Sequence, residues 1–303
     1  MGALPVCLDT LEKGHRWAVK WGPLIQGDIG DSDRLEELFR KYRPRSVVHL
    51  AGYIEVGESV QFPDRYLHNN ATKTQALIDV AIRYEVDAFV FSSTCAVYGY
   101  PEVANLPETH RISPLNPYAA SKALVEKKLR EAAGSGLRSA ALRYFNAAGS
   151  DPEAEIGESH TPETHLIPLA CDSALGIGPQ LTLHGVDYPT HDGSCVRDFV
   201  HVCDLAQAHI RAIGWLNGMT RMGHHEAFNL GTGNGHSVLE VLEQTRRVVG
   251  KAVPFSVSSR RVGDSHRLVG DISKASQILQ WQPMCSLVEQ IESTLRWRQH
   301  RPR

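Results

Sequence analysis

The chain has 303 residues, with 32 Lys and Arg residues, 34 Asp and Glu residues and a formal net charge of -2 at pH 7. Hydrophobic residues make up 42% of it, which is typical of a globular protein and excludes a disordered or fibrous one. The balanced charge, without basic blocks, argues against a nucleic-acid partner, and no apolar run reaches the roughly 18 residues of a membrane-spanning helix. Scattered cysteines without a CxxC motif, and no secretory signal at the N-terminus, favour a reduced, cytoplasmic protein.

Short apolar segments alternate with amphipathic segments along the first half of the chain. The predicted strands are 4–9, 46–51, 88–93 and 139–145, and the predicted helices are 32–42, 67–84 and 118–133. Continuous apolar strands separated by helices indicate a parallel sheet that is covered on both faces. The sequence therefore predicts an α/β fold with a doubly wound, Rossmann-like parallel sheet.

The alternation loosens after Asn146. Residues 147–200 are rich in Gly, Pro, Thr and Asp, a polar loop is predicted at 217–225, and helical periodicity returns in 204–216 and 237–249. We therefore predict a Rossmann-like domain over residues 1–146. A smaller α+β lobe is predicted over 147–303, mainly for substrate binding and with some segments returning to the first domain.

A tyrosine and a lysine four residues apart give the sharpest chemical signal. Tyr118 and Lys122 fall on one face of a predicted helix, and a cation beside a phenol lowers the pKa of the phenol from about 10 toward neutrality. Tyr118 would then serve as a general base or acid. An exposed tyrosine beside a solvated lysine gives the same pattern. Against that alternative, Ser92, Ser93 and Thr94 end a predicted strand, where open α/β sheets bind ligands.

Thr94, Tyr118 and Lys122 match the Ser/Thr–Tyr–Lys triad, and the chain resembles the extended short-chain dehydrogenase/reductases. Within these it is similar to the UDP-glucose 4-epimerases along essentially its whole length, most specifically at 187–202 (DYPTHDGSCVRDFVHV). The resemblance implies an NAD-dependent isomerase of galactose metabolism. Such an enzyme interconverts UDP-glucose and UDP-galactose by oxidation and re-reduction at C4 of the sugar, and a homodimer is expected.

The resemblance also implies roles for residues. Tyr118 would take the proton of the sugar 4-hydroxyl, Thr94 would position the 4-oxygen, and Lys122 would lower the pKa of Tyr118. The implied NAD-binding residues are Asp9, Asp28, Ile29, Leu50, Ala51, Gly52, Asn69, Ser92, Tyr118, Lys122, Tyr144 and Phe145. An acid at Asp9, on the adenosine ribose, favours NAD over NADP. Taken alone, Asp9 and Asp28 also fit as turn or cap residues.

The implied substrate-binding residues are Asn146, His165, Leu166, Arg197, Arg261 and Asp264. Arg197 and Arg261 are the expected phosphate clamps, because a guanidinium pairs with phosphate through two hydrogen bonds. Each arginine taken alone also fits as a surface residue. No metal site is predicted, since His224 and His225 have no carboxylates or cysteines at ligand spacing nearby.

No GxxGxxG motif precedes Asp9. The strand, glycine turn and helix that open this fold, roughly 20–30 residues, are therefore expected to be missing. Because that first strand is central in the order 3-2-1-4-5-6, we expect a gap in the sheet with two unpaired strand edges. The expectation is a fragment or mis-started form of an epimerase, or else a degenerate relative, that binds NAD poorly.

Two alternatives to a UDP-glucose 4-epimerase stay open. The first is another NAD-dependent sugar-nucleotide epimerase or dehydratase. A dehydratase would carry an acidic pair after the strand-end hydroxyl, where Cys95 and Ala96 stand instead. The second is an inactive remnant. The product formed from UDP-galactose separates all three.

Overall fold

The computed structural model describes residues 2–101, 103–178, 180–261 and 264–300, which divide into two compact units. Unit 1 comprises Met1–Val97, Pro114–Ala141 and Ala212–Ala227, and unit 2 comprises Tyr98–Ser113, Leu142–Arg211 and Phe228–Arg303. The functional division at residues 146 and 147 stays a prediction.

Unit 1 contains the alternating strands and helices that the sequence predicts. Its elements are β1 (Cys7–Asp9), η1 (Arg16–Ala18), β2 (Leu24–Gln26), α1 (Ser32–Tyr42), β3 (Ser46–His49), α2 (Val56–Gln61), α3 (Pro63–Leu67), η2 (His68–Thr72), α4 (Lys73–Arg83), β4 (Ala88–Thr94), α5 (Pro117–Ala132) and η4 (Ala133–Ser135). Four elements are divided between the two units: η3 (Cys95–Tyr98), β5 (Arg138–Tyr144), α7 (Val202–Asn217) and β10 (His224–Leu230). The predicted α/β class with parallel strands is confirmed, and α1 has its predicted bounds.

Two predicted segments differ from the structure. The predicted helix 67–84 is a series of three elements, α3, the π-helical turn η2 and α4. The extra residue that a π turn inserts shifts the face on which later side chains lie. The predicted loop 217–225 is also too long, because β10 begins at His224 and joins the sheet beside β5.

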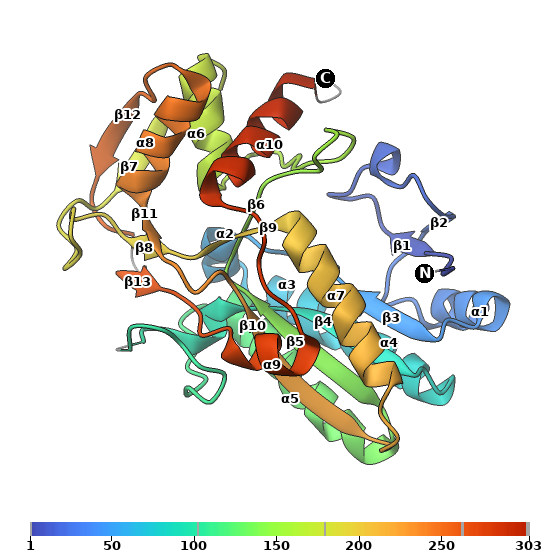
Figure 1. Ribbon diagram of the computed structural model, residues 1–303. Helices are drawn as coiled ribbons and strands as arrows, with labels where there is room; N and C mark the ends of the chain where they lie inside the picture. The colour runs from blue at the N-terminus through green and yellow to red at the C-terminus, as the bar shows by residue number, and fades with distance from the viewer. Residues whose placement is uncertain (1, 102, 179, 262–263, 301–303) are drawn as a thin grey trace. The chain divides into compact units, whose positions relative to one another are not determined.

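The parallel strands of unit 1 form two separate sheets. β1 pairs with β2 and places Cys7 opposite Leu24, while β3 pairs with β4 and places Ser46 opposite Ala88 in a sheet of order β10-β5-β4-β3 (Figure 1). Among the described residues, neither β1 nor β3 has a strand on its second edge. The predicted gap with two unpaired edges is therefore confirmed. At this gap Val48 of β3 is 40% exposed, which is unusual for an apolar residue of a covered parallel sheet.

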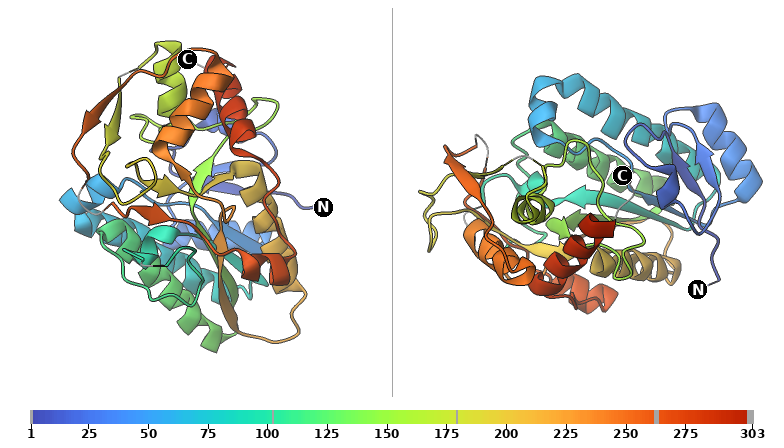
Figure 2. Two further views of the ribbon diagram at one scale, coloured as in Figure 1. Left: turned by 60° about the vertical axis from the view of Figure 1, so that its left-hand side comes forward. Right: turned by 90° about the horizontal axis from the view of Figure 1, so that it is seen from above.

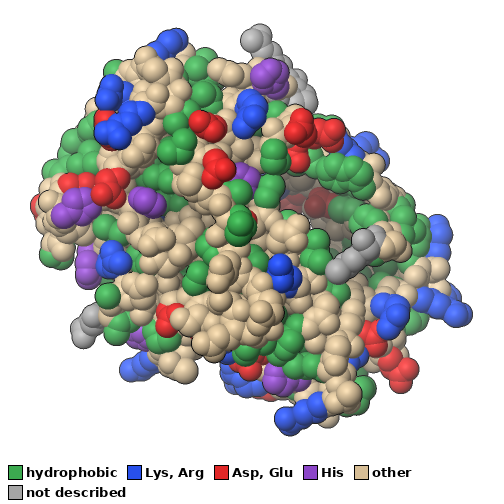
Figure 3. All heavy atoms as spheres, viewed as in Figure 1, with side chains coloured by type: hydrophobic (Ala, Val, Ile, Leu, Met, Phe, Trp, Pro, Cys, Tyr) green, Lys and Arg blue, Asp and Glu red, His purple; other side chains and the backbone are tan. Residues whose placement is uncertain are grey.

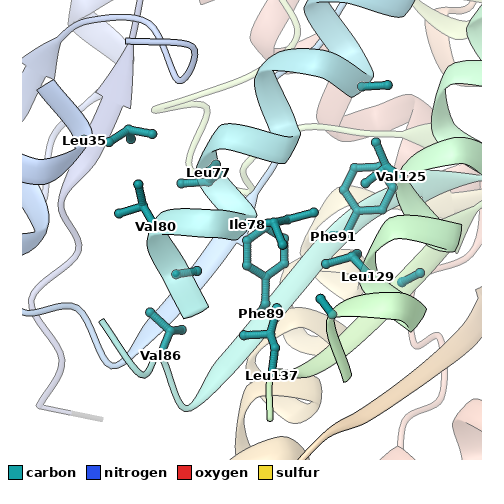
Figure 4. Packing of buried hydrophobic residues seen from close by; sticks show 14 of the residues in the cluster. Leu35, Leu77, Ile78, Val80, Val86, Phe89, Phe91, Val125, Leu129 and Leu137 are labelled. Atoms are coloured by element: carbon teal, nitrogen blue, oxygen red, sulfur yellow. The ribbon is translucent and has the colours of Figure 1, made fainter. Parts of the chain in front are cut away.

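The core of unit 1 lies between β4 and the helices that cover it. Phe89 and Phe91 of β4 project toward Ile78 of α4 and toward Val125 and Leu129 of α5 (Figure 4). All five side chains are buried, so this packing fixes the start of α5 relative to the end of β4.

Unit 2 is the irregular α+β part. Its short strands are β6 (Asn146–Ala148), β7 (Leu181–His184), β8 (Val196–Arg197), β9 (Phe199–His201), β11 (His236–Ser237), β12 (Phe255–Ser258) and β13 (Arg267–Leu268), and its helices are α6 (Leu166–Leu175), α8 (Val238–Val249), α9 (Ser273–Leu279) and α10 (Leu287–His300). Helices α6, α8 and α10 lie side by side around Ile167, Val241 and Ile291 (Figures 1 and 2). Ser237 caps α8 in a reciprocal pair with Glu240, which sets where that helix begins.

The visible surface carries charges of both signs. On the face drawn in Figure 3, Lys and Arg side chains are interspersed with Asp and Glu side chains. None of the helices in the described part of the chain combines the length and the apolar character that crossing a bilayer requires.

Candidate active site

The end of β4 and the start of α5 bring Thr94 and Tyr118 together. Asn116 caps α5 by accepting a hydrogen bond from the Ala119 N–H at 2.8 Å, and Pro117 occupies the first helical position. Tyr118 therefore lies in the first turn, where its side chain comes close to that of Thr94. Thr94 Oγ1 accepts the Ala96 N–H at 3.1 Å, which leaves its own hydrogen to donate toward the phenol oxygen.

Lys122 follows one turn later on α5. Its side chain is buried, its Nζ donates to the carbonyl oxygen of Ser92 at 2.8 Å, and it lies 4.9 Å from the centroid of the Phe91 ring. Burial lowers the pKa of Lys122 to about 8, because few polar groups replace the lost hydration. Ser92 thus contributes to this site through its backbone.

Burial dominates the electrostatics of Tyr118. Burial raises the pKa of Tyr118 to about 12, and the hydrogen bond from Thr94 opposes this rise. The lowering of this pKa by Lys122 together with the charge of a bound nicotinamide stays a prediction. Lys122 directs its ammonium at the Ser92 carbonyl, so the phenol stays protonated near pH 7 until a further positive charge or a proton acceptor comes close.

A residue that the sequence analysis missed holds the turn after β3 against α5. Asn70 accepts the Tyr53 N–H at 2.8 Å, donates to the Tyr53 carbonyl at 2.9 Å and donates to Ser121 Oγ at 3.2 Å. Gly52 has φ +155° in this turn, and a Cβ there would lie 3.1 Å from Asn70 Oδ1 and 3.6 Å from Lys122 Nζ. Asn69, the predicted cofactor contact, donates to Asn70 at 3.2 Å.

We expect Asn70→Ala to lower the free energy of unfolding by about 1–3 kcal/mol, because the backbone N–H and C=O of Tyr53 lose their buried partners. Asn69→Ala is the matched control, since it removes an amide with one hydrogen bond in the same turn, and we expect it to stay within about 0.5 kcal/mol. Urea unfolding followed by circular dichroism measures both. Equal effects of the two substitutions would contradict the role given to Asn70.

A buried carboxyl group lies one turn beyond Lys122. Ser93 Oγ donates to Glu126 Oε1 at 2.5 Å, and both side chains are buried. A glutamate within a helix full of charged residues gives no sequence signal of burial, so this support of the β4–α5 contact was not predicted.

The residues predicted at the adenosine end carry structural contacts. Asp9 ends β1 and accepts the Leu11 N–H at 2.7 Å. Asp28 accepts the Gly30 N–H at 2.7 Å and pairs with Lys73 Nζ at 2.5 Å. Burial would raise the pKa of Asp28, but these partners outweigh it and lower the pKa. Both carboxylates thus make the turn or cap contacts that the alternative interpretation expects. Their cofactor roles stay predictions.

The remaining predicted cofactor residues of unit 1 differ in exposure. Ile29 packs against the core around Leu35. Leu50 and Ala51 follow β3 and are exposed, Leu50 by 60%. Leu50 and Ala51 thus offer a surface to a flat ligand, whereas Ile29 supports the fold.

In unit 2, β5 leads to the predicted nicotinamide contacts. Tyr144 Oη is 2.5 Å from His209 Nε2, and the buried Phe145 ring covers the backbone of Gly270, where a Cβ would lie 2.7 Å from it. Asn146 begins β6, and its N–H donates to the carbonyl of Asp198 at 2.8 Å. These contacts of Tyr144, Phe145 and Asn146 are thus with partners that belong to unit 2.

Arg197, Arg261 and Asp264 are brought close to one another in unit 2. Arg197 Nη1 donates to the carbonyl of Ser265 at 2.8 Å, and Arg197 Nη2 lies 3.4 Å from Asp264 Oδ1. The Asp264 N–H donates to the Arg261 carbonyl at 3.3 Å. These contacts bring Asp264 and the Arg261 backbone close to Arg197 of β8.

A pocket of about 490 Å³ opens beside this segment and is lined by Tyr100, Tyr188, Pro189, Arg260, Arg261, Asp264 and His266. The sequence analysis did not single out Arg260, which pairs with Asp187 at 2.8 Å and lies 4.4 Å from the centroid of the Tyr188 ring. Two arginines and two aromatic rings in one pocket suit a ligand that has both phosphate groups and a flat base.

His165 and Leu166 lie where α6 begins. His165 is the N-cap residue of α6, but its side chain does not cap the helix and instead pairs with Glu158. Burial alone would lower the pKa of His165, and the carboxylate of Glu158 outweighs burial and raises it. The side chain of His165 is therefore committed to a contact that the sequence analysis did not foresee, whereas Leu166 supplies a first-turn N–H.

The model of the NAD dependent epimerase/dehydratase family matches residues 5–231. This chain belongs to that family. It is 46% identical over 301 residues to a UDP-glucose 4-epimerase of Rhizobium meliloti (strain 1021), a match that covers 99% of this chain and 91% of the relative.

Solved structures give the same result. A UDP-glucose 4-epimerase from Brucella ovis in complex with NAD is 41% identical, with a TM-score of 0.93 over 98% of this chain and 91% of that one. A UDP-glucose 4-epimerase from Bifidobacterium longum in complex with NAD+ and UDP is 31% identical, with a TM-score of 0.93 over 99% and 92% of the two chains.

Proposed function

We propose that this chain is an NAD-dependent UDP-glucose 4-epimerase, an isomerase that interconverts UDP-glucose and UDP-galactose. The observation that carries the proposal is the proximity of the Thr94 and Tyr118 side chains, with Lys122 one helical turn away, in a chain that belongs to the epimerase/dehydratase family. Cys95 and Ala96 follow Thr94, so the acidic pair of a dehydratase is missing at this point of the sequence.

Thr94, Tyr118 and Lys122 define the proposed path of the proton. Tyr118 Oη takes the proton of the sugar 4-hydroxyl and later returns it. Thr94 is placed to donate a hydrogen bond to the phenol oxygen, which would favour the phenolate that forms during the reaction. The buried Lys122 ammonium, held by the Ser92 carbonyl, adds a fixed positive charge on the same helix face.

The residues of unit 1 fit NAD at the end of β3. Leu50 and Ala51 are exposed there, and Gly52 comes so close to Asn70 and Lys122 that a side chain would fill the space. When bound, NAD accepts hydride from C4 of the sugar and gives it back. Asp9, at the end of β1, is the proposed partner of the adenosine ribose.

The pocket beside β8 is the proposed site of the UDP moiety, with Arg261 on a phosphate. We expect Arg261→Ala to weaken UDP binding roughly tenfold to a hundredfold, the worth of a charge-assisted hydrogen bond, and to leave NAD binding unchanged. Arg260→Ala is the matched control. Its guanidinium is engaged with Asp187 and Tyr188, so we expect a smaller loss. Isothermal titration with UDP and with NAD measures both, and an undiminished UDP affinity of Arg261→Ala would remove it from the site.

We also propose a cytoplasmic homodimer. Val56, Val60, Phe62 and Leu67 of the α2–α3 region are between 45% and 63% exposed, which is a concentration of apolar side chains that a second copy would cover. Six free cysteines support a reducing compartment. Analytical ultracentrifugation tests the dimer.

The product formed from UDP-galactose tests the activity. The protein is incubated with UDP-galactose and NAD, and the sugars are followed by proton NMR. UDP-glucose is the expected product. A 4-keto-6-deoxy sugar would establish the dehydratase alternative instead. No turnover, despite measurable binding of NAD and UDP, would show an inactive remnant.

A further inference from the structure

A second group of chemically active side chains lies in the segment that precedes α6. Of its members, only His165 was given a role above. One ligand atom from each of Glu158, His160, Glu163 and His165 lies within 4.8 Å of the others. We propose that these four side chains bind a divalent transition metal ion, with Zn²⁺ as the first candidate, and that the ion fixes the segment 158–165 to the start of α6.

The donor atoms suit zinc. Two imidazoles and two carboxylates are nitrogen and oxygen ligands of the kind that Zn²⁺ binds, whereas Ca²⁺ and Mg²⁺ prefer sites made of oxygen alone. The four ligand atoms of a tetrahedral zinc site, each bound at about 2.1 Å, lie about 3.4 Å apart, so the most widely separated atoms of the cluster would move together by up to about 1.4 Å on binding. Four protein ligands make such a site structural rather than catalytic.

His160 gives an independent indication of a ligand. Its Nδ1 is shielded from solvent and has no hydrogen-bond partner among the described residues, although Glu158 Oε1 is 3.0 Å away and Glu163 Oε1 is 3.6 Å away. A solvent-shielded imidazole nitrogen that faces two carboxylates at ion-pair distance is placed to bind a cation, either a proton or a metal ion.

The surroundings hold the ligands in place. Glu163 Oε2 is 3.5 Å from the guanidinium of Arg298, which is itself anchored by the buried Asp172. The Trp297 Nε1–H donates to the carbonyl of Glu158 at 2.8 Å. Both anchors belong to α10, beside which the segment between β6 and α6 runs in Figure 1. Such outer contacts orient metal ligands, and metal affinity depends on them.

Zinc titration of the whole chain tests the proposal. The protein is stripped with a chelator, desalted and titrated calorimetrically with ZnCl₂ at neutral pH, and its metal content is measured after gel filtration. We expect about one ion per chain and a higher melting temperature with zinc than in chelator. Co²⁺ in place of Zn²⁺ should give the absorption bands of a four-coordinate ion.

Two substitutions and a control complete the test. His160→Gln and Glu163→Gln should each weaken zinc binding by roughly tenfold or more. His191→Gln is the matched control, because His191 pairs with Glu240 at 3.2 Å and Asp192 at 3.6 Å outside the cluster, and we expect it to bind zinc as the unchanged protein does. Melting curves in chelator show that each variant folds.

The proposal is overturned if the unchanged protein retains far less than one ion per chain. It is also overturned if His160→Gln and Glu163→Gln bind zinc as tightly as His191→Gln. In either case the histidines and glutamates neutralise one another as ion pairs and need no metal.

Discussion

Tyr118→Phe is expected to lower the turnover of UDP-galactose by roughly 10²–10⁴-fold, the effect of removing a general base. The phenol oxygen is the only atom lost, and the backbone of α5 is held by Asn116 and by the packing of Val125 and Leu129. Binding of NAD and UDP should therefore stay unchanged. Steady-state kinetics, with separate titrations of NAD and UDP, measure these quantities.

Tyr66→Phe is the matched control for this loss. Its hydroxyl is also buried in unit 1, where it donates to Glu58 at 2.8 Å and to Glu55 at 3.1 Å. We expect it to change stability and to leave turnover within a few-fold of the unchanged enzyme. If Tyr118→Phe and Tyr66→Phe turn over alike, Tyr118 is not the base.

Lys122→Met is expected to reduce turnover by a similar factor and to raise the pH at which activity appears. The buried ammonium lies on the same face of α5 as Tyr118, so its loss leaves the phenolate without that fixed charge. The pH–rate profile of kcat for both proteins checks this. An unshifted profile would reject the coupling between the two side chains.

The same substitution has a second, structural readout. The pKa of Lys122 falls from 10.5 to about 8 on folding, so between these values the unfolded chain holds a proton that the folded chain has released. Raising the pH from about 8 to 10.5 therefore stabilises the folded protein relative to Lys122→Met, by on the order of 3 kcal/mol over the window. Below pH 8 the difference should be constant. Urea unfolding across this range measures it, and a difference independent of pH would contradict the burial of a charged Lys122.

Local signals account for most of what the sequence predicted correctly. Asp31 caps α1 through the Arg34 N–H at 3.0 Å, and Asn116 caps α5, so both helices begin where short-range hydrogen bonding places them. The four-residue spacing of Tyr118 and Lys122 predicted that they share a helix face, because α5 is a regular helix. The apolar strands have no periodicity of their own, so their positions were predicted from the turn residues at their ends.

The rest depends on contacts between segments that are distant in sequence. The π turn η2 places Asn70 rather than Asn69 against Ser121, and no local pattern separates two adjacent asparagines. The raised pKa of Tyr118 comes from burial, which the spacing of residues along the chain does not reveal. The cluster around His160 forms in an irregular segment that is anchored by α10, about 140 residues further along the chain.

Within the described part of the chain no strand pairs with the outer edge of β3, and this has a consequence for how the protein behaves in concentrated solution. The backbone N–H and C=O groups of this edge face away from β4, next to the exposed Val48 and Leu50, and a bare strand edge is a template for strands of other molecules. Growth at this edge would add one chain after another and would not stop at two copies, unlike the closed contact proposed for the α2–α3 region. Unit 1 thus carries one apolar surface suited to a defined assembly and one strand edge that favours aggregation.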